Sequence, residues 1–130
     1  MTESITVTAV FNTNRQKIFQ AWLNSRKHKE FTGSTAKASS EKGGKFMAWD
    51  GYISGKNLEL DPFERILQSW RTTEFNENDP DSIVEILFEE KNGKTTVTIN
   101  HSNIPEGQGK EYKKGWIDFY FKPMKEYFGS

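Results

Sequence analysis

Polar and apolar residues alternate near the start of the chain and then change to a helical spacing. Residues 4–11 alternate with a period of two, which predicts a β-strand. Residues 14–24 carry apolar side chains three and four positions apart, which predicts an amphipathic helix. Thr13 and Gln16 have the spacing of a capping box, so we expect Thr13 to cap this helix. A polar turn or short helix is expected to follow as far as residue 31.

From residue 35 the period of two returns and predicts six further strands before the last helix. Two turn sequences, Asp50-Gly51 and Asn92-Gly93, are typical of β-hairpins, because glycine tolerates the positive φ that primed turns require. The expected strand regions are, in order, the segment from residue 35 and the segments 43–49, 52–60, 65–73, 83–90 and 94–102.

The C-terminal segment, residues 110–128, is predicted to be a long helix that is apolar over more than half of its circumference. Pro123 is expected to kink it, because proline lacks a backbone N–H. Such a helix needs a curved partner. We therefore predict a single domain, residues 1–130, with an α+β fold in which a curved antiparallel β-sheet wraps around the C-terminal helix. The main apolar face is assigned to Tyr112, Trp116, Phe119, Pro123 and Tyr127.

Composition excludes several classes of function. The 130-residue chain has no cysteine and 18 basic and 18 acidic residues, so we expect no thiol chemistry, no disulfide and no nucleic-acid partner. No apolar run reaches the roughly 18 residues of a membrane span, and residues 1–4 lack the features of a signal peptide, so a cytoplasmic protein is expected. Aromatic residues are 14% of the chain and all hydrophobic residues only 34%, so rings must form much of the core.

The two histidines do not form a constellation for catalysis or metal binding. His28 lies in a charged stretch and is predicted to be a solvated surface residue. His101 shares a strand face with Val97 and Ile99, which leaves two interpretations open. It is either a core-edge histidine bonded to a backbone carbonyl, which we favour, or a polar group in a ligand pocket or general-acid site. We expect no catalytic residue, no metal site and no cofactor.

A sheet that curves around a kinked helix tends to leave a space between the two. An empty cavity of about 300 Å³ would cost on the order of 7 kcal/mol at about 24 cal/mol per Å³, which approaches the stability of a small domain. Either a ligand occupies such a space or rings fill it, and the number of rings favours a small or mostly filled cavity. The candidate ligand-binding residues are Trp49, Trp70, His101, Trp116 and Tyr120.

Lysines are concentrated on the last predicted helix and include Lys113 and Lys114. Two hypotheses are open: a solvated face whose lysine stems cover apolar rings, or a docking face for an acidic partner protein. Gly107 and Gly109 precede this helix. Their backbone amides either meet an anion or only give the chain the freedom to enter the helix, and we favour the second interpretation.

Five segments carry a resemblance to a known family. They are GGKF (43–46), DGYISG (50–55), ILQSWR (66–71), NGKT (92–95) and GWIDFYF (115–121). Over about residues 11–129 the chain resembles the activator of heat-shock protein 90 ATPase homologue family, C-terminal-domain type. That family lies in the START-like (SRPBCC) superfamily. The resemblance implies the helix-grip fold, a curved antiparallel sheet around a long C-terminal α-helix.

The resemblance leaves three functions open, in decreasing order of preference. Superfamily members bind lipids, sterols, polyketides or plant hormones under the last helix, which implies a non-enzymatic domain that binds a small hydrophobic molecule. Eukaryotic activators use this domain with a separate N-terminal domain to clamp a chaperone and stimulate its ATP hydrolysis. That implies a co-chaperone-like module for a heat-shock protein 90 type chaperone. A few superfamily members are cyclases, which implies a polyketide-cyclase-like enzyme.

Overall fold

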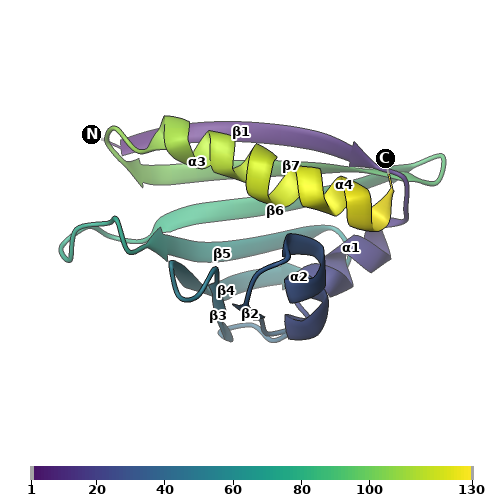
Figure 1. Cartoon of the computed structure of the whole chain (residues 1–130), viewed down its shortest axis with the longest axis horizontal. Helices are drawn as coiled ribbons and strands as arrows, with labels where there is room; N and C mark the ends of the chain where they lie inside the picture. The colour runs from purple at the N-terminus through teal and green to yellow at the C-terminus, as the bar shows by residue number, and fades with distance from the viewer. Residues whose placement is uncertain (1, 130) are drawn as a thin grey trace.

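The computed structural model describes residues 2–129, and in it a long helix lies across one antiparallel sheet (Figure 1). The strands are β1 (Thr2–Phe11), β2 (Ala36–Lys37), β3 (Lys45–Ala48), β4 (Ile53–Asp61), β5 (Arg65–Thr72), β6 (Ser82–Lys91) and β7 (Lys94–Pro105). The helices are α1 (Arg15–Trp22), α2 (Ser25–Thr32), α3 (Gly109–Gly115), the π-helical η1 (Trp116–Phe121) and α4 (Lys122–Phe128). The strands pair in the order β1-β7-β6-β5-β4-β3-β2. The predicted α+β helix-grip fold is confirmed.

The core lies between the sheet and the helices. The last helix consists of α3, η1 and α4 in succession, and it crosses the sheet near β1, β7 and β6 (Figure 1). The end of the sheet near the C-terminus of the chain is covered by α1 and α2. α2 packs against η1 and α4, and α3 packs against β1. None of the helices within residues 2–129 is long and apolar enough to cross a membrane. The sheet contributes fully buried aliphatic side chains, namely Ile66, Val84, Ile86, Val97 and Ile99.

The two predicted hairpin turns differ in length. In the β6–β7 turn Asn92 and Gly93 both have positive φ, 54° and 76°, as a two-residue primed turn requires. The β3–β4 connection is wider, because the strand pairing ends at Ala48 and Ile53. In that turn the Tyr52 N–H donates to the carbonyl oxygen of the residue three positions earlier, at 3.1 Å. The wider turn holds four residues instead of two, and two of them, Trp49 and Tyr52, face the last helix.

The first helical segment is two short helices, and the predicted capping box is wrong. Asn14 caps α1, since its Oδ1 accepts a hydrogen bond from the Lys17 N–H at 2.9 Å. Asn24 caps α2 in the same way. Asparagine is among the strongest N-cap residues, so the helix begins one residue later than predicted. The Thr13 carbonyl instead accepts a hydrogen bond from a threonine hydroxyl of β7.

The last helix changes its pitch in the middle, and the predicted apolar face is partly wrong. Phe119 is 58% exposed and Tyr127 is 42% exposed, although both were assigned to the buried face. Tyr112 and Trp116 are buried as predicted, and with the buried Tyr120 and Met124 they follow a strict spacing of four; Phe121 is buried as well. In a regular α-helix of about 3.6 residues per turn this spacing drifts around the axis.

The π-helical turn η1 corrects that drift. A π turn has i→i+5 hydrogen bonds and takes more residues than an α turn. The Lys122 N–H donates to the Ile117 carbonyl, five residues earlier, and α4 begins there with Pro123 in its first turn. The irregularity expected from Pro123 is therefore present as a wide turn immediately before the proline.

The start of α3 is fixed by a carboxylate from β1. Glu3 accepts hydrogen bonds from the Gly107 N–H at 3.0 Å and from the Gly109 N–H at 2.9 Å. These two bonds lower the pKa of Glu3. A Cβ on Gly109 would lie 2.6 Å from the Glu3 carboxylate. The amides before the last helix thus do meet an anion, and the anion belongs to the chain itself.

Candidate functional site

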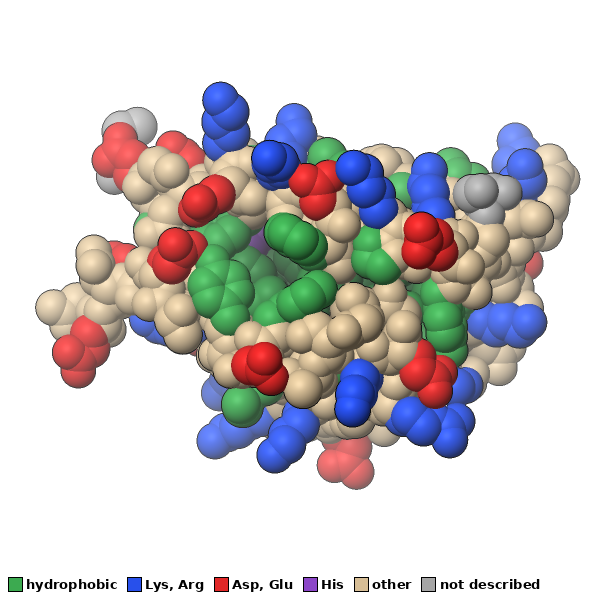
Figure 2. Space-filling model, in the orientation of Figure 1, with side chains coloured by type: hydrophobic (Ala, Val, Ile, Leu, Met, Phe, Trp, Pro, Cys, Tyr) green, Lys and Arg blue, Asp and Glu red, His purple; other side chains and the backbone are tan. Residues whose placement is uncertain are grey.

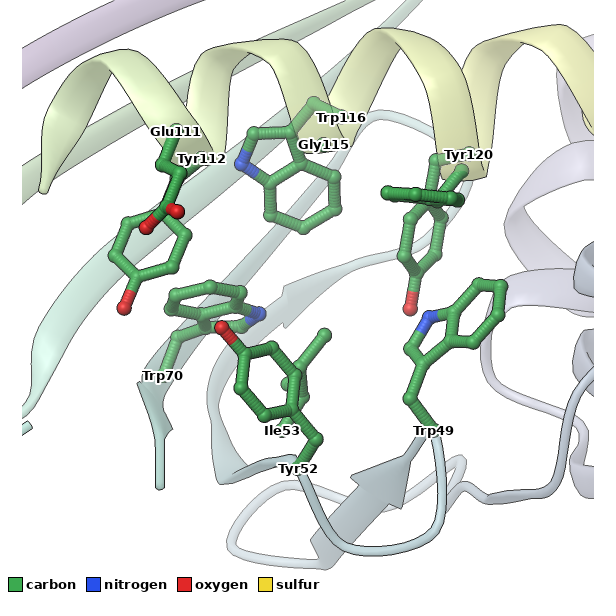
Figure 3. Close-up of a pocket in the computed structure, with 10 residues that line it drawn as sticks. Trp49, Tyr52, Ile53, Trp70, Glu111, Tyr112, Gly115, Trp116 and Tyr120 are labelled. Carbon is green, nitrogen blue, oxygen red and sulfur yellow. The ribbon is translucent and has the colours of Figure 1, made fainter. Parts of the chain in front are cut away.

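A cavity of about 290 Å³ lies between the sheet and the last helix and is partly open to solvent (Figure 3). This volume is near the lower end of the range for small-molecule sites. Trp49 and Tyr52 come from the β3–β4 turn, and the helix residues project toward them from above in the view of Figure 3. The ten lining residues are Trp49, Tyr52, Ile53, Trp70, Glu111, Tyr112, Gly115, Trp116, Phe119 and Tyr120.

The structure brings four of the five candidate ligand-binding residues together and leaves one out. Trp49, Trp70, Trp116 and Tyr120 line the cavity, whereas His101 does not. Six further lining residues were not among the candidates predicted from the sequence. Tyr112 carried a usable signal, because it lies one helical turn before Trp116. Those missed residues are Tyr52, Ile53, Glu111, Tyr112, Gly115 and Phe119.

His101 lies behind the cavity wall and is fully buried. Its Nδ1 accepts a hydrogen bond from Trp116 Nε1–H at 3.1 Å, so the proton of the neutral ring is on Nε2. Nε2–H donates to Ser82 Oγ at 2.8 Å, and the Ser82 hydroxyl donates to the Trp70 carbonyl at 2.6 Å. Burial lowers the pKa of His101 to about 3. His101 is thus a neutral histidine that bonds to side chains, and not to the backbone carbonyl that we predicted.

His28 is buried, so its prediction as a solvated surface residue is wrong. Only 5% of its surface is exposed. Nδ1 lies 2.9 Å from the Trp22 carbonyl and must donate to it, so Nε2 accepts from the Tyr120 hydroxyl at 3.0 Å. Burial lowers the pKa of His28 to about 4. Arg26, Lys29 and Glu30 around His28 are exposed, while the ring itself turns inward because α2 packs on the last helix.

The end of the cavity near α3 is polar and rich in hydroxyl groups. The Tyr112 hydroxyl donates to Gln108 Oε1 at 2.6 Å and lies 2.7 Å from Thr72 Oγ1. The Tyr52 hydroxyl donates to Glu74. Burial raises the pKa values of Tyr52 and Tyr112, and the nearby Glu74 carboxylate adds to both shifts. Both phenols are therefore neutral, and their protons are held by protein acceptors.

The rim of the cavity exposes aromatic surface. Phe119 is 58% exposed and Tyr52 is 36% exposed. Figure 2 shows this apolar patch as a hollowed green area with acidic side chains at its margin and lysines above it along the last helix. A contiguous exposed apolar patch of this kind is typical of an interaction or ligand site.

The buried serine and histidine do not form a nucleophile and base. The Ser82 hydroxyl gives its proton to the Trp70 carbonyl, while His101 Nε2–H donates to Ser82 Oγ. A general base would have to accept that proton instead. No group of three or more potential ligands for a metal ion occurs within residues 2–129.

Lys113 and Lys114 are exposed on α3. Within the described part of the chain neither forms an ion pair, unlike Lys122, whose Nζ lies 3.1 Å from Asp118 Oδ1. Neither lysine lines the cavity. They therefore present two uncompensated positive charges on the outer side of the last helix.

Comparison with known sequences identifies relatives over nearly the whole chain. A sequence model of the family described as "Activator of Hsp90 ATPase homolog 1-like protein" matches residues 12–129. The Homo sapiens protein "Activator of 90 kDa heat shock protein ATPase homolog 1" is 29% identical over 125 residues. That alignment covers 96% of this chain and 37% of the human protein, so the chain spans little more than a third of the relative's length.

Solved structures share the fold. An HSP90 activator from Plasmodium falciparum has a TM-score of 0.87 at 25% identity, with 97% of this chain and 96% of that chain covered. CalU16 from Micromonospora echinospora has a TM-score of 0.80 at 23% identity, with 98% and 76% covered. The second likeness shows the fold alone.

The two buried histidines predict a fall in stability in mild acid. Their folded-state pKa values, about 4 and 3, lie below the value of about 6.5 for an exposed histidine. Below pH 6.5 the unfolded chain takes up two protons that the folded chain does not, so stability falls as pH falls. Near pH 5 the free energy of unfolding should drop by about 2.7 kcal/mol per pH unit, as measured by urea denaturation.

The variant His28→Leu removes one of the two titrating groups. Its slope near pH 5 should be about half that of the parent chain, about 1.4 kcal/mol per pH unit. Lys29→Ala, at the exposed neighbouring position, should keep the full slope. A free energy of unfolding that is flat between pH 7 and 5, or equal slopes for all three proteins, would show that the histidines are not buried neutral.

Proposed function

The chain belongs to the family of Activator of Hsp90 ATPase homolog 1-like proteins, and on that premise we propose that it binds a chaperone of the Hsp90 type and modulates its ATP hydrolysis. The observation that carries the proposal is the family match over residues 12–129, which is nearly the whole chain. Relatives named for activation of the chaperone ATPase align with 96% of this chain. The proposal concerns the contact made by this one domain.

The outer side of α3 is the proposed contact surface. Lys113 and Lys114 are exposed there and form no ion pair with any residue from 2 to 129. Charges of one sign on a docking face raise the rate of association with an oppositely charged partner and fix its orientation. A row of lysines follows the last helix in Figure 2, so an acidic surface of the chaperone is the complementary partner.

Charge reversal of these two lysines should weaken binding to the chaperone. The double variant Lys113→Glu/Lys114→Glu places like charges against an acidic partner, and its Kd should rise at least about tenfold. Titration calorimetry with the purified full-length chaperone of the same organism measures this, and a coupled ATPase assay measures the change in turnover.

The matched control is Lys91→Glu/Lys94→Glu, which makes the same charge change at the β6–β7 turn, at the other end of the molecule (Figure 1). Its Kd should stay within about twofold of the parent value. An equal loss of affinity in both double variants would show that α3 is not the contact surface. A parent chain that neither binds the chaperone nor alters its ATPase would refute the proposed function.

A second function is favoured by one specific observation, the cavity lined mostly by rings. We propose that the cavity binds a small hydrophobic molecule. The residues proposed to contact this molecule are Trp49, Trp70, Trp116 and Tyr120. His101 lies outside the cavity and accepts a hydrogen bond from the Trp116 indole N–H, which fixes the position of that ring. A binding role is proposed and not catalysis, because the lining residues include one carboxylate and no histidine, serine or lysine.

A larger side chain at Gly115 should block the cavity without harming the fold. The nearest atom to a Cβ built at Gly115 is Phe119 Cδ2 at 3.9 Å, so the added side chain has room to extend. Gly115→Leu should raise the stability by up to about 1 kcal/mol through helix propensity. Indole, a small neutral ring, should shift the indole N–H resonances of Trp49 and Trp70 in the parent chain but not in this variant.

The matched control for the cavity is Glu126→Leu, at an exposed position of α4 outside the lining residues. It should bind indole as the parent chain does. Equal binding by the parent and Gly115→Leu would place the ligand elsewhere, and the absence of any shift in the parent would refute a small-molecule site for this probe class.

A further inference from the structure

The cavity contains a single charged group, and that group is a carboxylate. Glu111 is the only charged side chain among the ten lining residues, and it lies at the α3 end beside Tyr112 (Figure 3). Glu111 is exposed, and none of the ion pairs within residues 2–129 involves it. A second carboxylate, Glu74, lies close by; it accepts a hydrogen bond from the Tyr52 hydroxyl and forms no ion pair among the residues described. The wall is therefore negative at this end.

Most of the hydrogen-bond donors of the wall are already committed to protein acceptors. The Tyr52 hydroxyl donates to Glu74, and the Tyr112 hydroxyl donates to Gln108. The Trp116 indole N–H donates to His101. The Tyr120 hydroxyl donates to His28 at 3.0 Å, and the Trp49 indole nitrogen faces that hydroxyl (Figure 3).

The polar atoms left to a ligand are therefore mainly acceptors. They are phenol oxygen lone pairs and the Glu111 carboxylate. The one remaining donor is the Trp70 indole N–H, which has no hydrogen-bond partner in the described part of the chain. A complementary ligand must supply donors or positive charge, and an acceptor atom on it can meet Trp70.

Aromatic rings surround this negative end. A cation near the face of an aromatic ring is attracted by the ring quadrupole, and several rings together form the cage that recognises alkylammonium groups. The rings here come from four parts of the chain, namely the β3–β4 turn, β5, α3 and η1. The Trp70 and Tyr112 centroids are 4.9 Å apart, and those of Trp116 and Tyr120 are also 4.9 Å apart.

Resting on the small-molecule function proposed above, we infer that the cavity selects a small organic cation: an ammonium or alkylammonium group carried on an apolar skeleton. The inference depends on the position of Glu111 beside a wall of aromatic rings. Most hydrogen-bond donors of these rings already donate to acceptors of the protein. The lysines of the last helix do not line the cavity, and acidic side chains border the apolar patch in Figure 2. An anionic ligand would meet Glu111 with like charge. The volume of about 290 Å³ holds a single ring with a trimethylammonium group and excludes a long lipid.

Three probes of nearly the same shape and different charge test the inference. They are benzyltrimethylammonium, its uncharged carbon analogue neopentylbenzene, and the anion phenylmethanesulfonate. Binding is followed by the indole N–H resonances of the four tryptophans. Benzyltrimethylammonium should bind about tenfold more tightly than neopentylbenzene, with the largest shifts at Trp49 and Trp70, and the sulfonate should bind most weakly.

Two matched variants separate the carboxylate from the overall charge. Glu111→Gln keeps the shape of the side chain and should weaken binding of the cation about fivefold, with no change for neopentylbenzene. Glu126→Gln makes the same charge change at an exposed position of α4 outside the cavity and should leave both affinities unchanged.

The outcomes distinguish this inference from the function on which it rests. If neopentylbenzene or the sulfonate binds as tightly as the cation, or if Glu111→Gln behaves like Glu126→Gln, selection of a cation is refuted while the small-molecule site stands. If none of the three probes shifts the cavity tryptophans and indole also fails to shift them, the small-molecule site falls as well. If only the cation fails to bind, the inference alone is overturned.

Discussion

The structure depends on one polar contact inside a layer of rings, the hydrogen bond from Trp116 on the last helix to His101 on β7. The layer is dense: the Trp70 ring centroid is 4.5 Å from that of His101 and 5.7 Å from that of Trp116. A buried donor or acceptor that loses its partner costs about 1–3 kcal/mol. The bond therefore fixes both the rotation and the axial position of the helix on the sheet, which apolar contacts alone specify less strictly.

That fixed position determines where the cavity lies. His101 holds Trp116 and His28 holds Tyr120, so two rings of the helix are tied to the wall by their polar atoms. The π turn brings both residues to the sheet side and leaves Phe119 at the rim. Because these rings are held at the wall by hydrogen bonds, they surround a space and do not collapse into it. The cavity is a consequence of the same contacts that hold the helix in place.

Predictions from the sequence succeeded where the signal is local. The period of two, the Asn92-Gly93 turn and the apolar spacing of residues 110–128 each depend on neighbours within a few positions, and the seven strands and the last helix follow from them. Four of the lining residues were also predicted, from large rings on the expected strands and on the last helix. The wide β3–β4 turn that brings Tyr52 to the rim has no comparable local signal.

The failed predictions concern partners that are distant in the sequence or a change of helical pitch. His28 was assigned to the surface from its charged neighbours, but its partner Tyr120 lies 92 positions away. Glu3 meets the amides before α3 across more than a hundred residues. Phe119 was placed on the buried face because a regular α-helix was assumed, and one π turn shifts the phase.

The most direct measurement of the central contact is the tautomer of His101 in solution. Long-range ¹⁵N–¹H spectra of the imidazole rings distinguish the neutral Nε2–H form, the neutral Nδ1–H form and the imidazolium. We predict a single neutral Nε2–H form for His101 from pH 7 down to about pH 5, since Trp116 donates to Nδ1 and burial lowers the pKa to about 3. An Nδ1–H form or an imidazolium in that range would contradict the contact, and with it the placement of the last helix on the sheet.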